Sequence, residues 1–284
     1  MTIKQFLRPY WDLALLDNPL EDIVEGRLFK IRTIHHHYHD RWFADPFILT
    51  VSDTELSLLV EAFLYREQKG SIAKIVVDRE KLFITRCHII LEGKHLSFPY
   101  VFRKDGVIRI LPESSRDGNL KAYVYDDNTE TCRLENVICR EPLVDALLTD
   151  RWGKDILVAT KLPFQNGNTL EVWEQDRASG AFYWKYSIPF SDCIARNAGD
   201  FFTCQGVTYR PAQECNKWYG HAISLQKVVM NNDKLTFVEC RRLYSGVGMH
   251  TFNTYQGVTV VDLKQFRIGW LSALAYKIHG KTDL

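Results

Sequence analysis

The 284-residue sequence has no apolar run longer than a strand and no cysteine pairs at the close spacing of a zinc site. A transmembrane helix needs about 20 apolar residues, so we expect no membrane span. The first 18 residues also lack the apolar core and the cleavage site of a secretory signal. We therefore expect a soluble protein that stays in the cytoplasm.

The sequence also has little excess charge. Thirty-six Lys and Arg residues face 35 Asp and Glu residues, which leaves a formal charge of +1. A nucleic-acid or anionic-membrane partner would favour a strongly basic surface, so the balance argues against both. The seven cysteines are odd in number and scattered through apolar segments. This distribution favours buried, reduced thiols over a disulfide framework.

A pattern with a period of about fifty residues is the main feature that the sequence does contain. A polar or turn-forming residue beside a strand-like apolar run recurs at Asp45, Pro99, Asp145, Ala198 and Asn253. A second apolar run follows each of them roughly a dozen residues later. Several short strands per repeat of this length are typical of a propeller blade. We therefore predict an all-β fold, a five-bladed β-propeller with four-stranded antiparallel blades.

The repeats begin near residues 42, 95, 142, 195 and 250, and no linker or low-complexity tract interrupts them. We expect a single domain over residues 1–284. Residues 1–40 precede the first repeat, and an open ring would leave exposed sheet edges. We therefore expect this segment to close the ring by pairing residues 27–34, or the earlier run 11–16, with the C-terminal blade.

Four histidines, His35, His36, His37 and His39, come just before the first repeat. Clustered histidines can bind a metal. In a strand, however, neighbouring side chains face opposite ways, so at most two or three could converge. We expect a solvated or partly packed loop here, and we predict no metal-binding residues.

Acidic residues recur at two equivalent places in the predicted blades. The starts of the innermost strands carry Asp45 and Asp145, and the ends of the second strands carry Glu61, Glu113, Thr160, Arg210 and Asp262. In a propeller these places meet at one mouth of the central channel. Convergent carboxylates suit a neutral sugar or a cation, and glycosidic cleavage needs one carboxylic acid and one carboxylate. The alternative is structural, because acids at strand ends often only bond backbone amides.

Several short motifs together resemble a known family. They are WFADPF at 42–47 with Glu61, HLSFP at 95–99, PES at 112–114, VD at 144–145, RNAG at 196–199, YRPAQ at 209–213 with YG at 219–220, and HTFN at 250–253. They resemble the N-terminal propeller domain of plant glucosamine inositolphosphorylceramide transferases. A similar domain accompanies bacterial sugar formyltransferases and polysaccharide-synthesis loci. That domain in turn resembles the arabinanase, β-xylosidase and invertase clan of glycoside hydrolases.

The resemblance to the hydrolase clan implies catalytic roles for three residues. Asp45 matches the general base, which lies next to a proline in the first blade, and Asp145 matches the acid that tunes its pKa and orientation. The general acid of the clan is a Glu on a middle blade, where this sequence has Val158-Ala159-Thr160. We expect Glu113 to take that role, with Glu214 as the alternative. The resemblance also allows a cation in the channel, and the sequence identifies no other cofactor.

The remaining residues of these motifs are expected to bind substrate. They are Trp42, Glu61, His95, Arg196, Arg210, Gln213, His250 and Asn253. Arg196, Arg210 and Gln213 form a polar group on the fourth blade that suits the phosphate or carboxylate of an acidic sugar or sugar phosphate. Alternatively, these arginines only brace carboxylates across the channel.

Three hypotheses for the function follow. The first is a carbohydrate-active enzyme that acts on a glycosidic bond in intracellular glycan or polysaccharide metabolism. The second is a glycosyltransferase or phosphorylase that uses a nucleotide sugar or a sugar phosphate, with arginines holding the phosphate. The third is a glycan-binding domain without activity, which the missing middle-blade Glu favours. The expected partner is a carbohydrate or sugar-phosphate ligand in each case.

Overall fold

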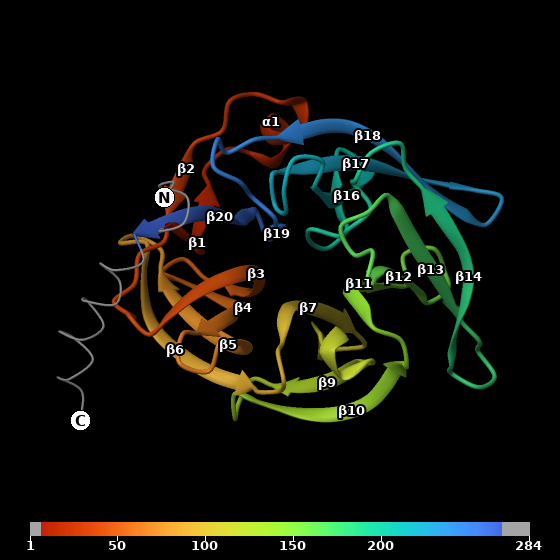
Figure 1. The fold of residues 1–284 in the computed structure, drawn as a ribbon, viewed down its shortest axis with the longest axis horizontal. Helices are drawn as coiled ribbons and strands as arrows, with labels where there is room; N and C mark the ends of the chain where they lie inside the picture. Colours follow the sequence, from red (N-terminus) through yellow and green to blue (C-terminus); the bar gives the residue numbers. More distant parts are fainter. Residues whose placement is uncertain (1–6, 269–284) are drawn as a thin grey trace.

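Five four-stranded antiparallel sheets surround a common axis in the structure, a computed structural model that describes residues 7–268 (Figure 1). In the first four sheets the first strand in chain order lies nearest the axis and the last lies at the periphery. This arrangement confirms the predicted all-β, five-bladed propeller. None of the helices within residues 7–268 has the length and apolar character that crossing a membrane needs.

The first four blades follow the order of the chain. Blade one contains β3 (Arg41–Val51), β4 (Glu55–Leu64), β5 (Lys69–Asp78) and β6 (Phe83–Leu91). Blade two contains β7 (Ser97–Lys104), β8 (Val107–Glu113), β9 (Leu120–Asp126) and β10 (Thr131–Cys139). Blade three contains β11 (Leu143–Thr149), β12 (Ile156–Lys161), β13 (Thr169–Gln175) and β14 (Phe182–Pro189). Blade four contains β15 (Phe202–Cys204), β16 (Val207–Glu214), β17 (Ala222–Asn231) and β18 (Lys234–Leu243).

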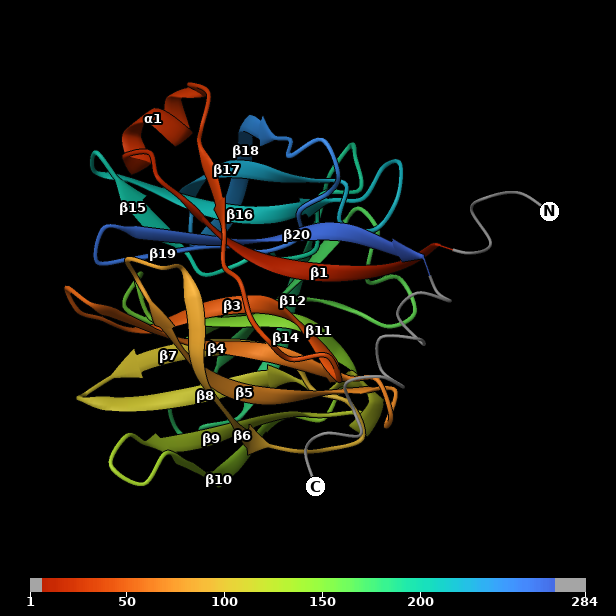
Figure 2. The same ribbon diagram turned by 90° about the vertical axis from the view of Figure 1, so that its left-hand side faces the viewer.

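The fifth blade combines both ends of the described chain. Its inner strands are β19 (Phe252–Tyr255) and β20 (Val258–Ile268), and its outer strands are β1 (Leu7–Leu16) and β2 (Ile31–Thr33). β1 pairs with β20 along its whole length, so the two strands run side by side (Figure 2). The predicted ring closure is therefore confirmed, and both candidate segments take part. The strand predicted at 27–34 is shorter than expected, because only residues 31–33 pair with β1.

Tight turns set the register of the inner hairpins. Asp105-Gly106 joins β7 to β8 and Gln205-Gly206 joins β15 to β16, and all four residues have positive φ. This conformation matches the twist of antiparallel strands, and glycine adopts it without steric cost. A short helix, α1 (Leu20–Glu25), connects β1 to β2, and a 3₁₀ turn (Ser115–Asp117) follows β8.

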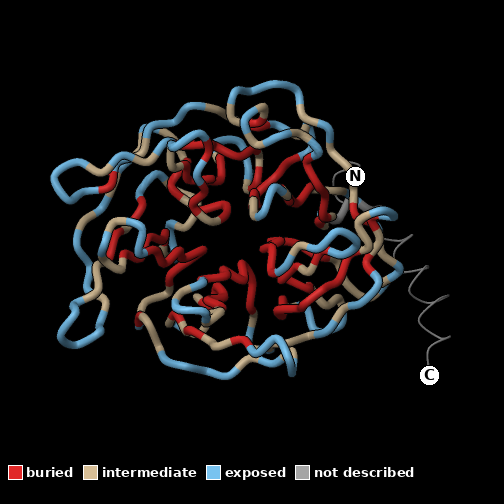
Figure 3. Tube along the Cα trace, turned by 180° about the vertical axis from the view of Figure 1, so that it is seen from behind, coloured by how far each residue is buried: buried red, intermediate tan, exposed pale blue. Residues whose placement is uncertain are grey.

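Burial decreases from the axis outward, as Figure 3 shows for the whole ring. Most side chains of the second strands β4 and β12 are buried, whereas the side chains of the peripheral strand β14 are exposed or half-buried. Apolar side chains of neighbouring blades pack together. Leu13 of β1, for example, joins a core cluster with Ile48 and Leu58 of blade one. The inner strands are thus held firmly enough to position side chains at the axis.

Candidate functional site at the propeller axis

The innermost strands of the first three blades share one distortion. Asp45, Phe98 and Asp145 have left-handed backbones, with φ of 51°, 43° and 48°, and each lies in a β-bulge. This conformation costs a non-glycine residue of order 1 kcal/mol, so the surrounding ladders must stabilise it. The bulge makes Phe98 the second-blade counterpart of Asp45. The repeat had predicted Pro99, one residue too late.

Asp45 connects three blades at the axis. Its carboxylate accepts hydrogen bonds from the Thr251 hydroxyl before β19, at 2.8 Å, and from the Phe98 N–H of β7, at 2.9 Å. Its own N–H donates to Asp262 of β20 at 3.1 Å. Burial raises the pKa of Asp45, and the nearby His250 opposes this shift. Both carboxylate oxygens thus have structural partners.

Asp145 lies next to two of the predicted polar residues of the fourth blade. Its Oδ2 accepts hydrogen bonds from Arg196 Nε at 2.6 Å and from Gln213 Nε2 at 2.9 Å. Burial raises the pKa of Asp145 to about 6, although the Arg196 charge opposes the shift. Arg196 also donates through Nη1 to Asn166. The structure therefore brings Asp145, Arg196 and Gln213 together.

The surroundings of Glu61 favour its protonated form. Glu61 lies in the last part of β4, opposite Ala44. Burial raises its pKa well above the ordinary value, and the charges of Asp45 and Glu113 add to the effect. His95 Nε2 is 3.7 Å from Glu61 Oε1. His95 Nδ1 accepts the Gly70 N–H at 2.9 Å, so Nε2 carries the proton that faces Glu61. Burial lowers the pKa of His95.

Glu113 occupies the equivalent place in blade two, opposite Ser97. Its carboxylate accepts the Ser97 hydroxyl at 2.8 Å and the Ser115 N–H at 2.8 Å. Of the four acids Asp45, Glu61, Glu113 and Asp145, it is the most exposed, at 8%. The third-blade equivalent is Thr160, opposite Val144. Three catalytic residues predicted from the sequence therefore lie at one end of the axis together with Glu61.

A potential cation site adjoins this group. Asp45, His250 and Asp262 offer ligand atoms within 4.8 Å of one another. Asp262 Oδ2 is 2.6 Å from His250 Nδ1. Burial alone would lower the pKa of His250, but the charges of Asp262 and Asp45 outweigh it, so the pKa is raised. A protonated His250 supplies the positive charge itself. These residues fit an internal ion pair better than a metal centre, and His250 is too buried to touch a ligand directly.

Arg210 does not join the axial group. It is fully buried and donates to Asn197 Oδ1 at 2.7 Å, to Gln226 Oε1 at 2.6 Å and to the Ala195 carbonyl. The phenyl ring of Phe237 covers the guanidinium at 4.9 Å. The residue opposite Asn197 is Ala212, so the strand-end position of blade four is two residues later than the sequence suggested. The structure thus gives Arg210 a structural role, contrary to the predicted substrate contact.

Two other residues predicted to bind substrate, Trp42 and Asn253, contact other groups of the protein. Trp42 is half-buried and stacks on Phe63, with ring centroids 4.7 Å apart, and Phe63 in turn contacts His95 edge-on. An aromatic row therefore leads from Trp42 toward Glu61. Asn253 is buried and bridges the Pro46 carbonyl and the Asp200 N–H. It holds blades five, one and four together, and both ends of its amide bond to the protein.

The histidine run forms a mixed segment. His35, His37 and His39 are exposed and His36 is half-buried, with its ring edge-on to Phe43. The only group of metal-ligating side chains found among the described residues is the one around His250. The run is thus a partly packed loop, as predicted.

Tyr219, from the YG motif, also belongs to the site. Its ring covers the Arg196 guanidinium at 4.9 Å and meets the His250 ring edge-on at 5.2 Å. Its position in the YG motif beside a strand end was the available signal. The loop reaches the axis through contacts with Arg196 and His250, which no local sequence pattern encodes.

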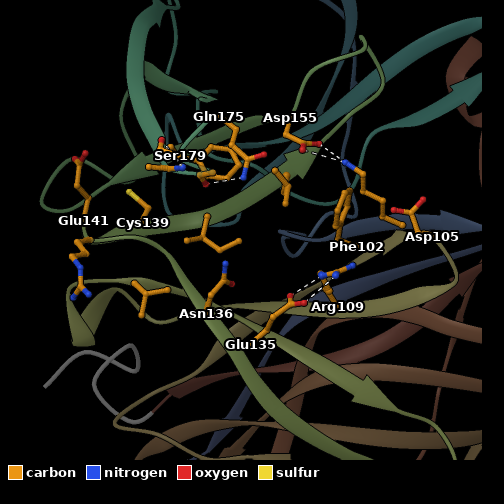
Figure 4. A pocket seen from close by; sticks show the side chains of 18 residues that line it. Phe102, Asp105, Arg109, Glu135, Asn136, Cys139, Glu141, Asp155, Gln175 and Ser179 are labelled. Atoms are coloured by element: carbon orange, nitrogen blue, oxygen red, sulfur yellow. Dashed lines mark hydrogen bonds and ion pairs between the residues drawn. The ribbon is translucent and has the colours of Figure 1, made fainter. Parts of the chain in front are cut away.

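A separate surface groove lies away from these residues. It encloses about 860 Å³ between β10 of blade two and the β13–β14 turn of blade three. Ion pairs join Arg109 to Glu135 and Lys104 to Asp155 across its walls (Figure 4). None of the predicted site residues lines this groove. The axial end therefore remains the candidate site.

Comparison with known proteins agrees with this geometry. Residues 31–271 match the family described as "Glucosamine inositolphosphorylceramide transferase 1, N-terminal". The chain belongs to this family. It is 29% identical over 234 residues to glucosamine inositolphosphorylceramide transferase 1 of Arabidopsis thaliana, covering 76% of this chain and 30% of the relative. The japonica rice protein of the same name is 27% identical, with 84% and 33% covered. The chain thus spans about a third of the length of these curated relatives.

Solved structures of glycoside hydrolase family 43 share the fold. A GH43_1 enzyme from Xanthomonas citri has a TM-score of 0.55 at 12% identity, with 80% of this chain and 89% of that chain covered. A GH43B protein of a Bacteroides ovatus xyloglucan locus has a TM-score of 0.54 at 11% identity, with 79% and 51% covered. At these identities the likeness concerns the fold. It confirms the resemblance to that clan of propellers.

Proposed function

We propose that this chain binds a carbohydrate at the acidic end of the propeller axis and acts on a glycosidic bond there. The proposal rests on two carboxyl groups, Glu61 and Glu113, which occupy equivalent positions on the second strands of adjacent blades but have different surroundings. One is buried beside His95 and favours its protonated form, and the other is the more exposed acceptor of two hydrogen bonds. Glycosidic cleavage requires such a division of roles.

Glu61 is the proton donor in this proposal. A general acid must hold its proton near neutral pH, and the raised pKa of Glu61 meets that requirement. The His95 Nε2–H faces Glu61 Oε1 and can stabilise the carboxylate after the proton has left. This assignment replaces the sequence-based choice of Glu113 as the acid.

Glu113 is the carboxylate partner, as base or nucleophile. Each of its oxygens accepts one hydrogen bond, and a carboxylate oxygen has two lone pairs, so one acceptor site remains on each. Asp45 was expected in this role, but the donors to its oxygens, Thr251 and Phe98, belong to blades five and two, so it ties blades together, whereas both donors to Glu113 belong to its own blade. Asp145, fixed by Arg196 and Gln213, tunes the charge of the site without touching the bond.

Turnover by Glu61→Gln tests the proposal. The wild-type protein and the variant would be incubated with xylotriose, β-1,3-galactotriose and a library of aryl glycosides, and the products separated by chromatography. Loss of one acid–base group typically costs about 10²- to 10⁴-fold in rate. Glu55→Gln, at the exposed start of the same strand, is the matched control and should keep full activity. Glycan binding by the wild type without turnover would contradict the enzyme and leave a binding domain.

A sugar-phosphate or nucleotide-sugar transferase is the second candidate. Arg196 uses Nε for Asp145 and Nη1 for Asn166, and within residues 7–268 its Nη2 makes no hydrogen bond. Arginine suits bidentate contact with phosphate. The relatives that carry this domain are themselves transferases by name. If this candidate holds, UDP-sugars should raise the melting temperature of the wild type and not of Arg196→Met, while neutral oligosaccharides have no effect.

A further inference from the structure

Two exposed aromatic rings flank one histidine on the fourth blade. The loop between β16 and β17 carries Trp218, which is 46% exposed, and the segment after β18 carries Tyr244, which is 52% exposed. His221 lies between them. Its ring meets Trp218 edge-on, with centroids 4.5 Å apart at 80°, and Tyr244 at 5.3 Å and 68°. Large rings left in water at one spot indicate a surface that binds something.

A buried carboxylate fixes the orientation of His221. Glu214, at the end of β16, is hydrogen-bonded through Oε2 to His221 Nδ1 and through Oε1 to the Asn216 N–H. Burial works against its charge, but the bonds to His221 and Asn216 outweigh it and lower the pKa of Glu214. The Nδ1–H therefore donates to Glu214, and Nε2 faces the other way. His221 is nine-tenths buried, and within residues 7–268 its Nε2 makes no hydrogen bond.

This cluster adjoins the axial site. Tyr219, in the same loop, contacts Arg196 and His250 at the axis. Glu214 lies at the same end of the propeller as Glu61 and Glu113, because all three lie in the last part of the second strand of their blade. A ligand of more than one sugar unit could therefore extend from the axis over Tyr219 to Trp218.

We propose that Trp218, His221 and Tyr244 form a second sugar-binding subsite, which takes one pyranose ring of an oligosaccharide whose next unit occupies the axial site. The apolar C–H face of a pyranose packs on an aromatic ring, and a sugar hydroxyl can bond to His221 Nε2 in either role. An anionic ligand fits less well, because the nearby Arg242 already pairs with Asp192 and Glu239. The inference rests on the proposed function, since it assigns that site an extended substrate.

Equilibrium binding to a glycan array that includes xylose, xylotriose, galactose and β-1,3-galactotriose tests the subsite. The wild type would be compared with Trp218→Ala, His221→Phe and the axial variant Arg196→Met. Trp184→Ala is the matched control, because Trp184 is 54% exposed on the outer strand β14. We expect Trp218→Ala and His221→Phe each to lower the affinity for trisaccharides about tenfold, the effect of losing one hydrogen bond or ring contact. The affinity for single sugars should not change.

The outcomes separate the two proposals. Trisaccharide binding that depends on Arg196 and is unchanged in Trp218→Ala would overturn the subsite and leave the axial site standing. Binding that depends on Trp218 but not on Arg196 would support the subsite and count against the axial function. If the wild type binds no glycan on the array, both proposals fail.

Discussion

The surroundings of Glu61 determine its protonation and, through it, how the stability of the protein depends on pH. Glu61 is buried among other carboxylates, and its raised pKa means that the folded protein holds a proton that the unfolded chain releases above about pH 4.5. The unfolded state then binds fewer protons, so stability falls as pH rises from about 4.5 through the raised pKa. Glutamine in its place keeps the shape and has no proton to lose.

We therefore predict that Glu61→Gln has a flatter stability profile than the wild type. Between pH 5 and pH 8 the wild type should lose more melting temperature, and Glu61→Gln should be the more stable of the two at pH 8. Thermal unfolding followed by circular dichroism across this range measures the difference. Parallel profiles in the two proteins would mean that Glu61 is ionised throughout, and the proton-donor role would fall with it.

Arg210 gives a second prediction at this scale. Replacing it by methionine leaves the oxygens of Asn197, Gln226 and Ala195 buried without donors. Each unsatisfied group costs about 1 to 3 kcal/mol, so we expect Arg210→Met to lose about 3 kcal/mol or more of unfolding free energy. Urea titration measures this loss. Arg86→Met, at a mostly exposed side chain, is the control. If Arg210→Met were as stable as Arg86→Met but no longer bound sugar, Arg210 would have the ligand-binding role predicted from the sequence.

Arg196 and Arg210 illustrate what the sequence could not resolve. Each follows a short, mostly apolar run, CIA before Arg196 and VTY before Arg210. Only the register of β16, with Asn197 opposite Ala212, turns one arginine toward Asp145 and the other into the wall of the blade. A shift of one or two residues in a strand is invisible to a repeat count, yet it decides which side chains reach the axis.

At the scale of single elements, the sequence was most informative about the strands themselves. Alternating apolar runs and Asp-Gly or Gln-Gly turns predicted the hairpins, because turn chemistry and side-chain period are local properties. The bulges at Asp45 and Asp145 were not predicted. Their cost is repaid by contacts with neighbouring blades, such as the Phe98 N–H, which no local pattern encodes.

The start of β5 must remain free of a side chain for Glu61 to lie where it does. A Cβ added at Gly70 would overlap Glu61 Oε1 and would come within 2.5 Å of the Leu96 carbonyl. Because one of these atoms is backbone, the strand has to shift. We predict that Gly70→Ala loses about 1 to 3 kcal/mol of stability and reduces turnover along with it.

Urea unfolding and the glycoside assay on the same preparation measure both effects of Gly70→Ala. Gly93→Ala, in the turn between β6 and β7, is the control, because the atoms nearest its added Cβ belong to the Leu96 side chain, at 3.2 Å or more. A Gly70→Ala protein with wild-type stability and turnover would show that the Glu61 position is not tightly defined. The proton-donor geometry would then need a different explanation.

For the molecule as a whole, the sequence predicted the number of blades and the closure by the N-terminal segment, because both follow from repetition and from the need to cover sheet edges. It could not predict that the acids at the axis also bind the blades together. Asp45 bonds to groups of blades two and five, and Asp145 to groups of blade four. The same side chains therefore contribute to ring closure and to the charge of the site.

Ring closure through β1 should make the propeller unfold as one cooperative unit. Leu13 of β1 is 2% exposed and packs with residues of blade one across the closing seam. Truncating a buried leucine to alanine costs about 2 to 5 kcal/mol, so Leu13→Ala should lower the unfolding free energy by about 3 kcal/mol while the urea transition remains single. Leu28→Ala, at a side chain 98% exposed between α1 and β2, should change the unfolding free energy very little.

The closing contact between β1 and blade one joins the first and last blades, so its loss should weaken all five blades together. Circular dichroism and tryptophan fluorescence should then give the same midpoint of unfolding. Two separate transitions, or a Leu13→Ala loss no larger than that of Leu28→Ala, would mean that blades two to four hold the axial site without the closed ring.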